Sequence, residues 1–161
     1  MRKFITCMAF FLVAVAVLTG LHKHNLKVAM AANPVDIAAL LCKNLNNLRA
    51  ENGLNMLTED NSLKEIADLR AEEAALKWSH ERPNGNMGYE LLQKNKWRGE
   101  NLAFIDAKGL TADKINNKLF RDLCESPSHY ANMTFAEYKR VGIGVYKTMD
   151  GEVYVAFIFT S

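Results

Sequence analysis

Apolar residues recur at helical spacing in the first part of the chain that follows residue 32. Asn33 and Pro34 begin this stretch, since asparagine caps helices well and proline suits the first helical position. Asn52 and Gly53 end it, because glycine readily adopts the left-handed conformation that stops a helix. The apolar positions between them share one helical face: Ile37, Leu40, Leu41, Leu45 and Leu48. The pattern predicts one helix between these two boundaries.

A second helix is predicted to start at Asp60 or Asn61 and to run to Ser79–His80. Its inner face is formed by the apolar positions Leu63, Ile66, Ala67, Ala74 and Trp78. Charged residues are assigned to the opposite, solvent-facing side: Lys64, Glu65, Arg70 and Glu73. On this reading, His80 closes the helix.

The segment 81–110 is rich in glycine and asparagine and is predicted to be irregular, apart from a short helix at Tyr89–Gln93. So long a loop in a compact domain usually has a function. Thr111 then caps a third helix with an apolar face made of Ile115, Leu119, Phe120 and Leu123. Ser126–Pro127 starts a further short helix by the same cap-and-proline logic, with His129 in its first turn.

The end of the chain alternates between apolar and polar residues, which is typical of strands. The two predicted strands, Val141–Tyr146 and Val153–Phe159, are joined by the turn Met149–Asp150–Gly151 and form a hairpin. Helices that come first and strands that come last predict an α+β domain, with helices packed on a small antiparallel sheet.

The first 31 residues resemble a secretory signal peptide, with a basic start, an apolar run at Phe4–Leu18 and the small-residue exit Ala29–Met30–Ala31. The alternative is an uncleaved N-terminal anchor. Either reading predicts export of a single domain, residues 32–161. This domain carries 16 basic and 18 acidic residues, a formal charge of −2, because four basic residues precede Ala32. The charge gives no reason to expect nucleic-acid binding.

Two cysteines, Cys42 and Cys124, follow the leader. In an exported protein they could form one disulfide. Two buried free thiols are the alternative, and the sequence leaves both open.

Only two histidines, His80 and His129, follow the leader, and each lies in a short polar motif. Glu100 lies between them in the loop Gly99–Glu100–Asn101. Two imidazoles and a carboxylate at the ends of elements could converge on a cleft. They could hold a divalent ion, or the carboxylate could fix the tautomer of an imidazole for acid–base chemistry.

Each of these residues also has a purely structural reading. His80 could cap the end of the second helix, Glu100 could bond to backbone N–H groups of its loop, and His129 could pack. Asn101 is expected to tie loops together, and Tyr130 to line the cleft or to pack. A serine hydrolase based on Ser126 is disfavoured, because the chain has no Gly-x-Ser-x-Gly elbow.

Five motifs together resemble the CAP superfamily, also called SCP domains (cysteine-rich secretory, antigen-five and pathogenesis-related proteins), and in particular its bacterial branch. In chain order they are Leu45–Leu54, Ser79–Gly85, Gly99–Ala103, Ser126–Met133 and Gly142–Val145. The resemblance covers roughly residues 38 to 160. It implies an α-β-α sandwich with a cleft centred on two histidines and acidic partners.

By this resemblance, His80 and His129 are the two histidines and Glu100 is the first acid. The second acid of many eukaryotic members corresponds to Ser126 here. The expected cleft therefore comprises His80, Glu100, Asn101, Ser126, His129 and Tyr130. Its candidate metal ligands are His80, Glu100 and His129, with zinc, calcium or magnesium as the ion.

Three functions remain open. The first is a secreted binding module for a divalent metal ion or for a small ligand such as a lipid or a cell-wall fragment. The second is a peptidase-like or esterase-like hydrolase in which a histidine acts as general base and Glu100 orients it. The third is a structural or partner-binding domain without a ligand.

Overall fold

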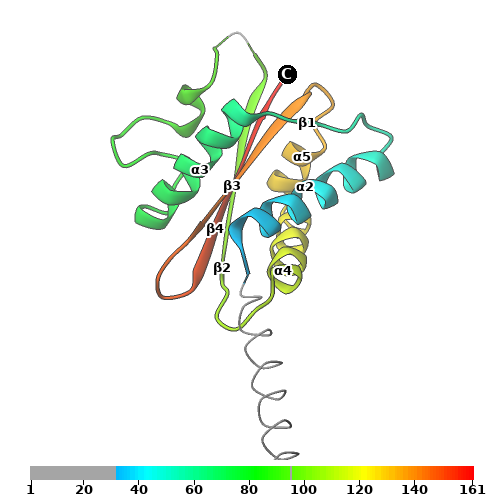
Figure 1. The fold of residues 1–161 in the computed structure, drawn as a ribbon. Helices are drawn as coiled ribbons and strands as arrows, with labels where there is room; N and C mark the ends of the chain where they lie inside the picture. Colours follow the sequence, from blue (N-terminus) through cyan, green and yellow to red (C-terminus); the bar gives the residue numbers. More distant parts are fainter. Residues whose placement is uncertain (1–31, 95) are drawn as a thin grey trace, which may run out of the picture. The chain divides into compact units, whose positions relative to one another are not determined.

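The computed structural model describes residues 32–94 and 96–161, so the predictions for the leader lie outside the described residues. Figure 1 shows the elements in chain order. The helices are α2 (Pro34–Glu51), α3 (Asn61–Leu76), α4 (Ala112–Glu125), α5 (Pro127–Met133) and the 3-10 helix η1 (Gly88–Leu91). The strands are β1 (Thr58–Glu59), β2 (Arg98–Asp106), β3 (Arg140–Lys147) and β4 (Glu152–Thr160). No helix of the described segments has the length and apolar character needed to cross a membrane.

The strands form one sheet in the order β1-β3-β4-β2. The predicted hairpin is confirmed: β3 and β4 pair antiparallel, and Gly151 in their turn has φ +95°. The short strand β1 pairs parallel with β3, so the sheet is mixed. The prediction of an irregular segment 81–110 is wrong for residues 98–106, which form β2 and pair with β4 along its whole length.

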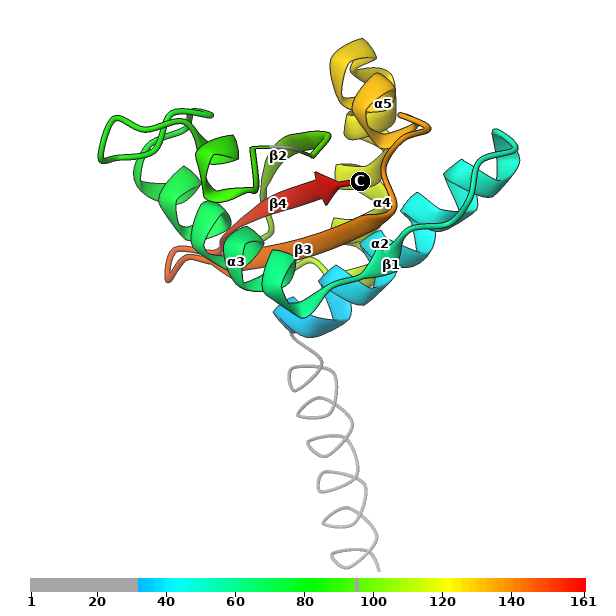
Figure 2. The same cartoon turned by 90° about the horizontal axis from the view of Figure 1, so that it is seen from above.

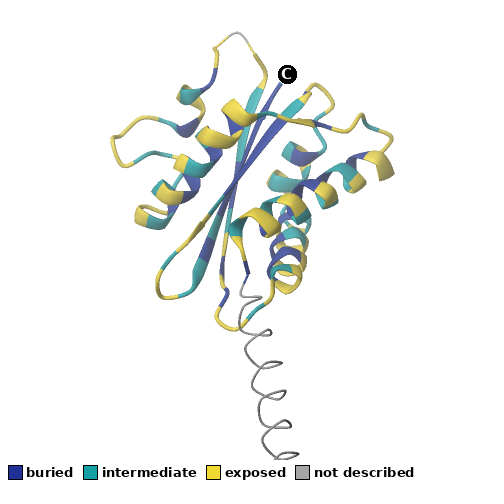
Figure 3. Ribbon diagram, viewed as in Figure 1, coloured by how far each residue is buried: buried dark blue, intermediate teal, exposed yellow. Residues whose placement is uncertain are grey.

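Helices cover both faces of the sheet, which gives the predicted three-layer α-β-α sandwich (Figure 2). Helix α3 covers one face, and α2 and α4 cover the other. Side chains of β4 alternate between these layers: Val153, Val155, Phe157 and Phe159 join the core under α2 and α4, and Ala156 and Ile158 join the core under α3. The central strands β3 and β4 are accordingly the most buried part of the ribbon (Figure 3).

All four α-helices start at the predicted cap residues, and three of these caps make the side-chain bond. Asn33, Asp60 and Thr111 each accept a backbone N–H of the first helical turn. Ser126 is the N-cap residue of α5 and Pro127 its first residue, as predicted, but the Ser126 side chain makes no capping bond. Helix α3 ends at Leu76, before the predicted boundary, and the side chain of Trp78 is exposed instead of facing the core.

Helix α3 lies directly on β3 because two glycines leave room for its backbone. A Cβ atom at Gly142 would overlap the backbone of Leu63 and Lys64, and one at Gly144 would overlap the backbone of Ala67 and Asp68. This close approach fixes α3 against the sheet, and α3 carries charged residues of the site described below.

Both cysteines are free thiols in the structure, Cys42 buried and Cys124 half-buried. Burial, together with nearby Glu59, raises the pKa of the Cys42 thiol to about 12. Burial also raises the pKa of Cys124. Of the two readings that the sequence left open, the structure has the free thiols.

Candidate functional site

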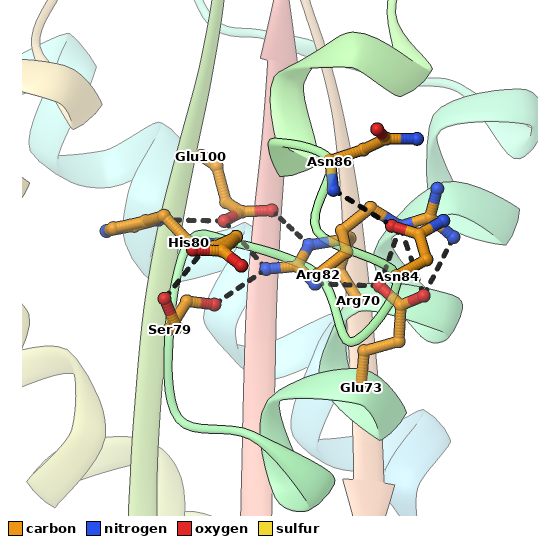
Figure 4. Close-up of polar contacts among 9 residues, drawn as sticks. Arg70, Glu73, Ser79, His80, Arg82, Asn84, Asn86 and Glu100 are labelled. Atoms are coloured by element: carbon orange, nitrogen blue, oxygen red, sulfur yellow. Dashed lines mark hydrogen bonds and ion pairs between the residues drawn. The ribbon is translucent and has the colours of Figure 1, made fainter.

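His80 lies in the loop after α3, and its imidazole is held by Glu100 of β2. The Nδ1 atom lies 2.8 Å from Oε1 of Glu100 (Figure 4). A carboxylate at this position accepts the Nδ1–H bond, so a neutral His80 keeps its lone pair on Nε2. The His80 side chain is 54% exposed, whereas the Glu100 side chain is 5% exposed. A buried carboxylate therefore orients an accessible imidazole.

Arg70 of α3 engages both carboxylate oxygens of Glu100. Its Nε donates to Oε2 at 2.7 Å and its Nη2 donates to Oε1 at 3.2 Å. Burial alone would raise the pKa of Glu100, but the hydrogen bonds from His80 and Arg70 hold it below its usual value. Glu100 is therefore ionised at neutral pH, and its charge is matched by the guanidinium.

Arg70 also extends the network away from the cleft. Its Nη1 donates to Glu73 at 2.7 Å and its Nη2 to the Ser79 carbonyl at 2.9 Å, and Glu73 in turn pairs with Arg82 at 2.7 Å. The sequence analysis placed Arg70 on the solvent side of its helix. That prediction is wrong, because the Arg70 side chain is fully buried.

Gly88 of η1 provides the space for this ion pair. A Cβ atom there would lie 2.5 Å from Oε2 of Glu100 and 2.7 Å from Nε of Arg70. Any larger residue would have to displace the ion pair that orients His80.

His129 lies in the first turn of α5 and is tied to β2 through its backbone. Asn101 donates to the His129 carbonyl at 3.0 Å and accepts a bond from Asn132 at 2.8 Å. The predicted role of Asn101 in tying segments together is confirmed by these bonds. Tyr138 extends the chain of bonds by donating to Asn132 at 2.8 Å.

Burial lowers the pKa of His129, and the charge of nearby His80 lowers it further. His129 is therefore predominantly neutral at pH 7. A neutral imidazole can accept a proton or ligate a metal ion.

The two imidazoles line the same cavity, which has a volume of about 490 Å³. This size lies in the range of small-ligand sites. The lining residues come from β2, α5 and the segments that flank them: His80, Trp97, Arg98, Glu100, Asn101, Ser128, His129, Ala131, Asn132, Phe135 and Tyr138. A neighbouring hollow also includes both histidines and is bounded by Trp78 and Met87.

Two residues of the predicted cleft lie elsewhere. The Ser126 hydroxyl lies 3.3 Å from that of Ser128, and it is Ser128 that lines the cavity. The Tyr130 hydroxyl donates to Asn52 after α2 at 3.0 Å and is not part of the lining.

The lining also contains residues that the sequence analysis did not assign to the site, notably Arg98, Phe135 and Tyr138. Trp97 and Arg98 directly precede the Gly99–Glu100–Asn101 motif, and this adjacency was the one sequence feature that could have indicated their place in the cavity lining. Phe135 and Tyr138 follow α5 without any comparable pattern.

The described residues do not form the predicted metal site with three protein ligands. Both oxygens of Glu100 are hydrogen-bonded to His80 and Arg70. Within residues 32–94 and 96–161, no group of three or more His, Cys, Asp or Glu is placed to hold a metal ion. Glu100 accordingly supports His80 and is not itself available as a ligand.

Comparison with known proteins relates this site to a family. Residues 43–160 match the family model described as CAP, cysteine-rich secretory protein family. A comparison by sequence with curated proteins gave no match.

The fold is similar to that of several solved structures. An outer surface protein from Borrelia burgdorferi shares 19% identity with a TM-score of 0.64, over 80% of this chain and 95% of that one. An extracellular protein containing an SCP domain from Bacillus anthracis shares 20% identity with a TM-score of 0.61, over 76% of this chain and 40% of that one. NaASP2, solved with Zn²⁺, shares 15% identity with a TM-score of 0.59, over 77% of this chain and 78% of that one. The family match and the shared fold show that this chain belongs to the CAP family of cysteine-rich secretory proteins.

Proposed function

We propose that this protein is an exported CAP domain whose cavity binds a divalent transition metal ion, zinc above all, through His80 and His129. The observation that carries the proposal is the bond between Glu100 and Nδ1 of His80. It leaves Nε2 of His80 as the free lone pair, beside a second imidazole that burial keeps neutral. Carboxylate support behind a ligating histidine is a common feature of metal sites and increases the basicity of the ligand.

The donor set favours zinc over calcium and magnesium. Imidazole nitrogen suits zinc, copper and nickel, whereas calcium and magnesium prefer oxygen ligands. The cavity has one carboxylate in its lining, Glu100, and Arg70 already occupies it. Two imidazoles leave further coordination positions for water or for a small ligand. NaASP2, a protein of similar fold, was solved with Zn²⁺.

Export is the second part of the proposal. The basic start, apolar run and small-residue exit of residues 1–31 support a secretory leader. Two relatives of similar fold are an outer surface protein and an extracellular protein. Mass spectrometry of the protein from the culture medium should find its N-terminus near Ala32, whereas an intact leader in the membrane fraction would support the anchor instead.

The hydrolase alternative has less support. Ser128 lines the cavity beside His129, but its hydroxyl contacts Ser126. Within the described segments, the Ser128 hydroxyl makes no hydrogen bond to either imidazole. The alternative without any ligand would make the Arg70–Glu100–His80 network purely structural. Metal titration separates this alternative from metal binding.

The test is calorimetric titration of the purified protein with Zn²⁺, Ca²⁺ and Mg²⁺. His80 and His129 are the only histidines after residue 31, so histidine-dependent binding in the exported chain is assigned without ambiguity. We expect one zinc ion per chain, with affinity more than about 100-fold lower in His80→Ala or His129→Ala, because the loss of a direct ligand should cost more than the roughly 10- to 100-fold that is typical of losing a residue that only supports a ligand. Calcium and magnesium should give much weaker heats.

Cys124→Ser is the matched control, because its half-buried thiol is a zinc-binding side chain that lies outside the lining of the cavity. Zinc affinity should not change in this variant. No zinc heat in the wild type, or full zinc affinity in the double histidine variant, would refute the proposal.

A further inference from the structure

The charge of the cavity is set by an alternating series of side chains. Along the series, Arg82, Glu73, Arg70 and Glu100 are joined by ion pairs of 2.7 Å (Figure 4). The two positive and the two negative charges of this series cancel. Glu100 is the one acidic residue in the lining of the cavity, and its charge is therefore already neutralised from behind.

Arg98, the first residue of β2, is a cation in this lining and forms no ion pair with any residue of 32–94 or 96–161. Its Nη1 donates to the carbonyls of Tyr89 and Leu92, both at the long distance of 3.4 Å, and the guanidinium carbon lies 5.1 Å from the centre of the Tyr89 ring. A guanidinium has five N–H donors, so most donors of Arg98 remain available for a ligand.

The other arginines of the described segments have carboxylate partners or are buried against backbone carbonyls, which makes Arg98 distinctive. Arg70, Arg82, Arg121 and Arg140 each pair with a carboxylate. Arg49 is buried and donates to four backbone carbonyls. Among the arginines of the described segments, Arg98 alone combines a place in the wall of a cavity with the lack of a carboxylate partner.

The same cavity has an apolar wall. Trp97 packs edge-on against Phe135 with ring centroids 5.3 Å apart, and 59% of the Trp97 surface is exposed. An aromatic wall next to an unpaired guanidinium suits a molecule with an apolar body and an anionic oxygen group, because planar guanidinium groups bind carboxylate and phosphate in a bidentate manner.

We propose that the cavity binds a small organic anion, with its carboxylate or phosphate group paired to Arg98 and its apolar body against Trp97 and Phe135. This site does not depend on the proposed metal ion. The proposal names the class of ligand that the cavity would hold, and the two histidines alone do not specify this class.

The test uses probes that share a phenyl body and differ in charge: phenylacetate, phenyl phosphate, neutral phenylacetamide and cationic 2-phenylethylamine. Binding is measured by NMR titration of protein that has been stripped of metal with EDTA and then dialysed into buffer without chelator, so that failure of the metal proposal does not affect the result. We expect at least one anion to bind about tenfold more tightly than the neutral amide, as a charge-assisted hydrogen bond predicts. Comparing the two anions distinguishes a carboxylate site from a phosphate site.

Arg98→Gln should remove this preference while leaving the melting temperature close to that of the wild type. Arg121→Gln, which alters an exposed arginine on α4 outside the lining, is the control and should retain the preference. Equal affinity for the anions and the amide, an unchanged preference in Arg98→Gln, or no saturable binding of either anion up to about 10 mM would overturn the proposal.

Discussion

Replacing Arg70 with methionine would remove the cation that neutralises Glu100 without leaving a large cavity. The variant loses the bonds from Arg70 to Glu100, to Glu73 and to the Ser79 carbonyl. Glu73 keeps its partner Arg82, whereas Glu100 is left buried with only the His80 imidazole. Removing one member of a buried ion pair typically costs about 3–5 kcal/mol. For a domain of this size we expect the melting temperature to fall by about 10–15 °C.

The loss should depend on pH, and its sign follows from the pKa of Glu100. In the wild type the pKa of this carboxyl is lowered, so its contribution to stability is present above its usual pKa and is lost as the pH falls through the lowered value. In Arg70→Met, burial is no longer offset by the guanidinium, and the pKa rises. The difference in unfolding free energy between wild type and variant should therefore be largest at pH 7 and should shrink towards pH 4.

Urea denaturation followed by circular dichroism at both pH values measures this difference. Arg121→Met is the matched control, because Arg121 is 59% exposed and pairs with the equally exposed Asp122. We expect the control to change stability by less than about 0.5 kcal/mol at either pH. A loss below about 1 kcal/mol for Arg70→Met at pH 7, or the same loss at both pH values, would refute the assigned role of the buried pair.

Three further measurements test other parts of the structure. Gly144→Ala should destabilise the protein by about 1–3 kcal/mol or more, because the new methyl group meets the backbone of Ala67 and not a movable side chain. An unchanged free energy of unfolding in urea denaturation would contradict the close contact of α3 with β3. The His129 imidazole should titrate by NMR below pH 6.5, and a midpoint at or above 6.5 would contradict its burial. Because the folded state binds this proton more weakly than the unfolded state, the stability of the protein should decrease as the pH falls below 6.5. Iodoacetamide should label Cys124 before Cys42 in the native protein without any reductant, because the pKa of Cys42 is about 12; thiols that react only after reduction would indicate a disulfide.

The two buried arginines show how a hydrophobic pattern can be read too narrowly. Arg70 follows Ala67 by three residues and precedes Ala74 by four, so it falls on the same face as the apolar residues of its helix. Arg49 likewise follows Leu45 by four residues. The prediction for Arg70 took its charge as a sign of exposure, although its spacing from the apolar residues already indicated burial; no prediction was made for Arg49. A charged residue on an apolar face indicates a buried partner, here carboxylates for Arg70 and backbone carbonyls for Arg49.

The sequence could not predict β2 from its own residues. Gly99, Glu100 and Asn101 have little preference for strands, and the strand exists because β4 pairs with it along nine positions. The hairpin and the main helices depend on local patterns and were predicted. The meeting of His80 and His129 at one cavity depends on the pairing of β2 with β4 and on the position of α5, which no local pattern specifies.

Arg49 of α2 has a consequence for the cavity, although it lies outside it. Its guanidinium donates to the carbonyl of Met133, the last residue of α5, and to those of Phe135 and Tyr138 in the segment directly after it. These bonds hold in place the segment that follows His129 and supplies Phe135 and Tyr138 to the cavity wall. The opposite wall, with His80, is anchored by Arg70. Each half of the cleft thus has its own cationic anchor on a different helix, and evolution could reposition one histidine by altering one anchor while the other stays in place.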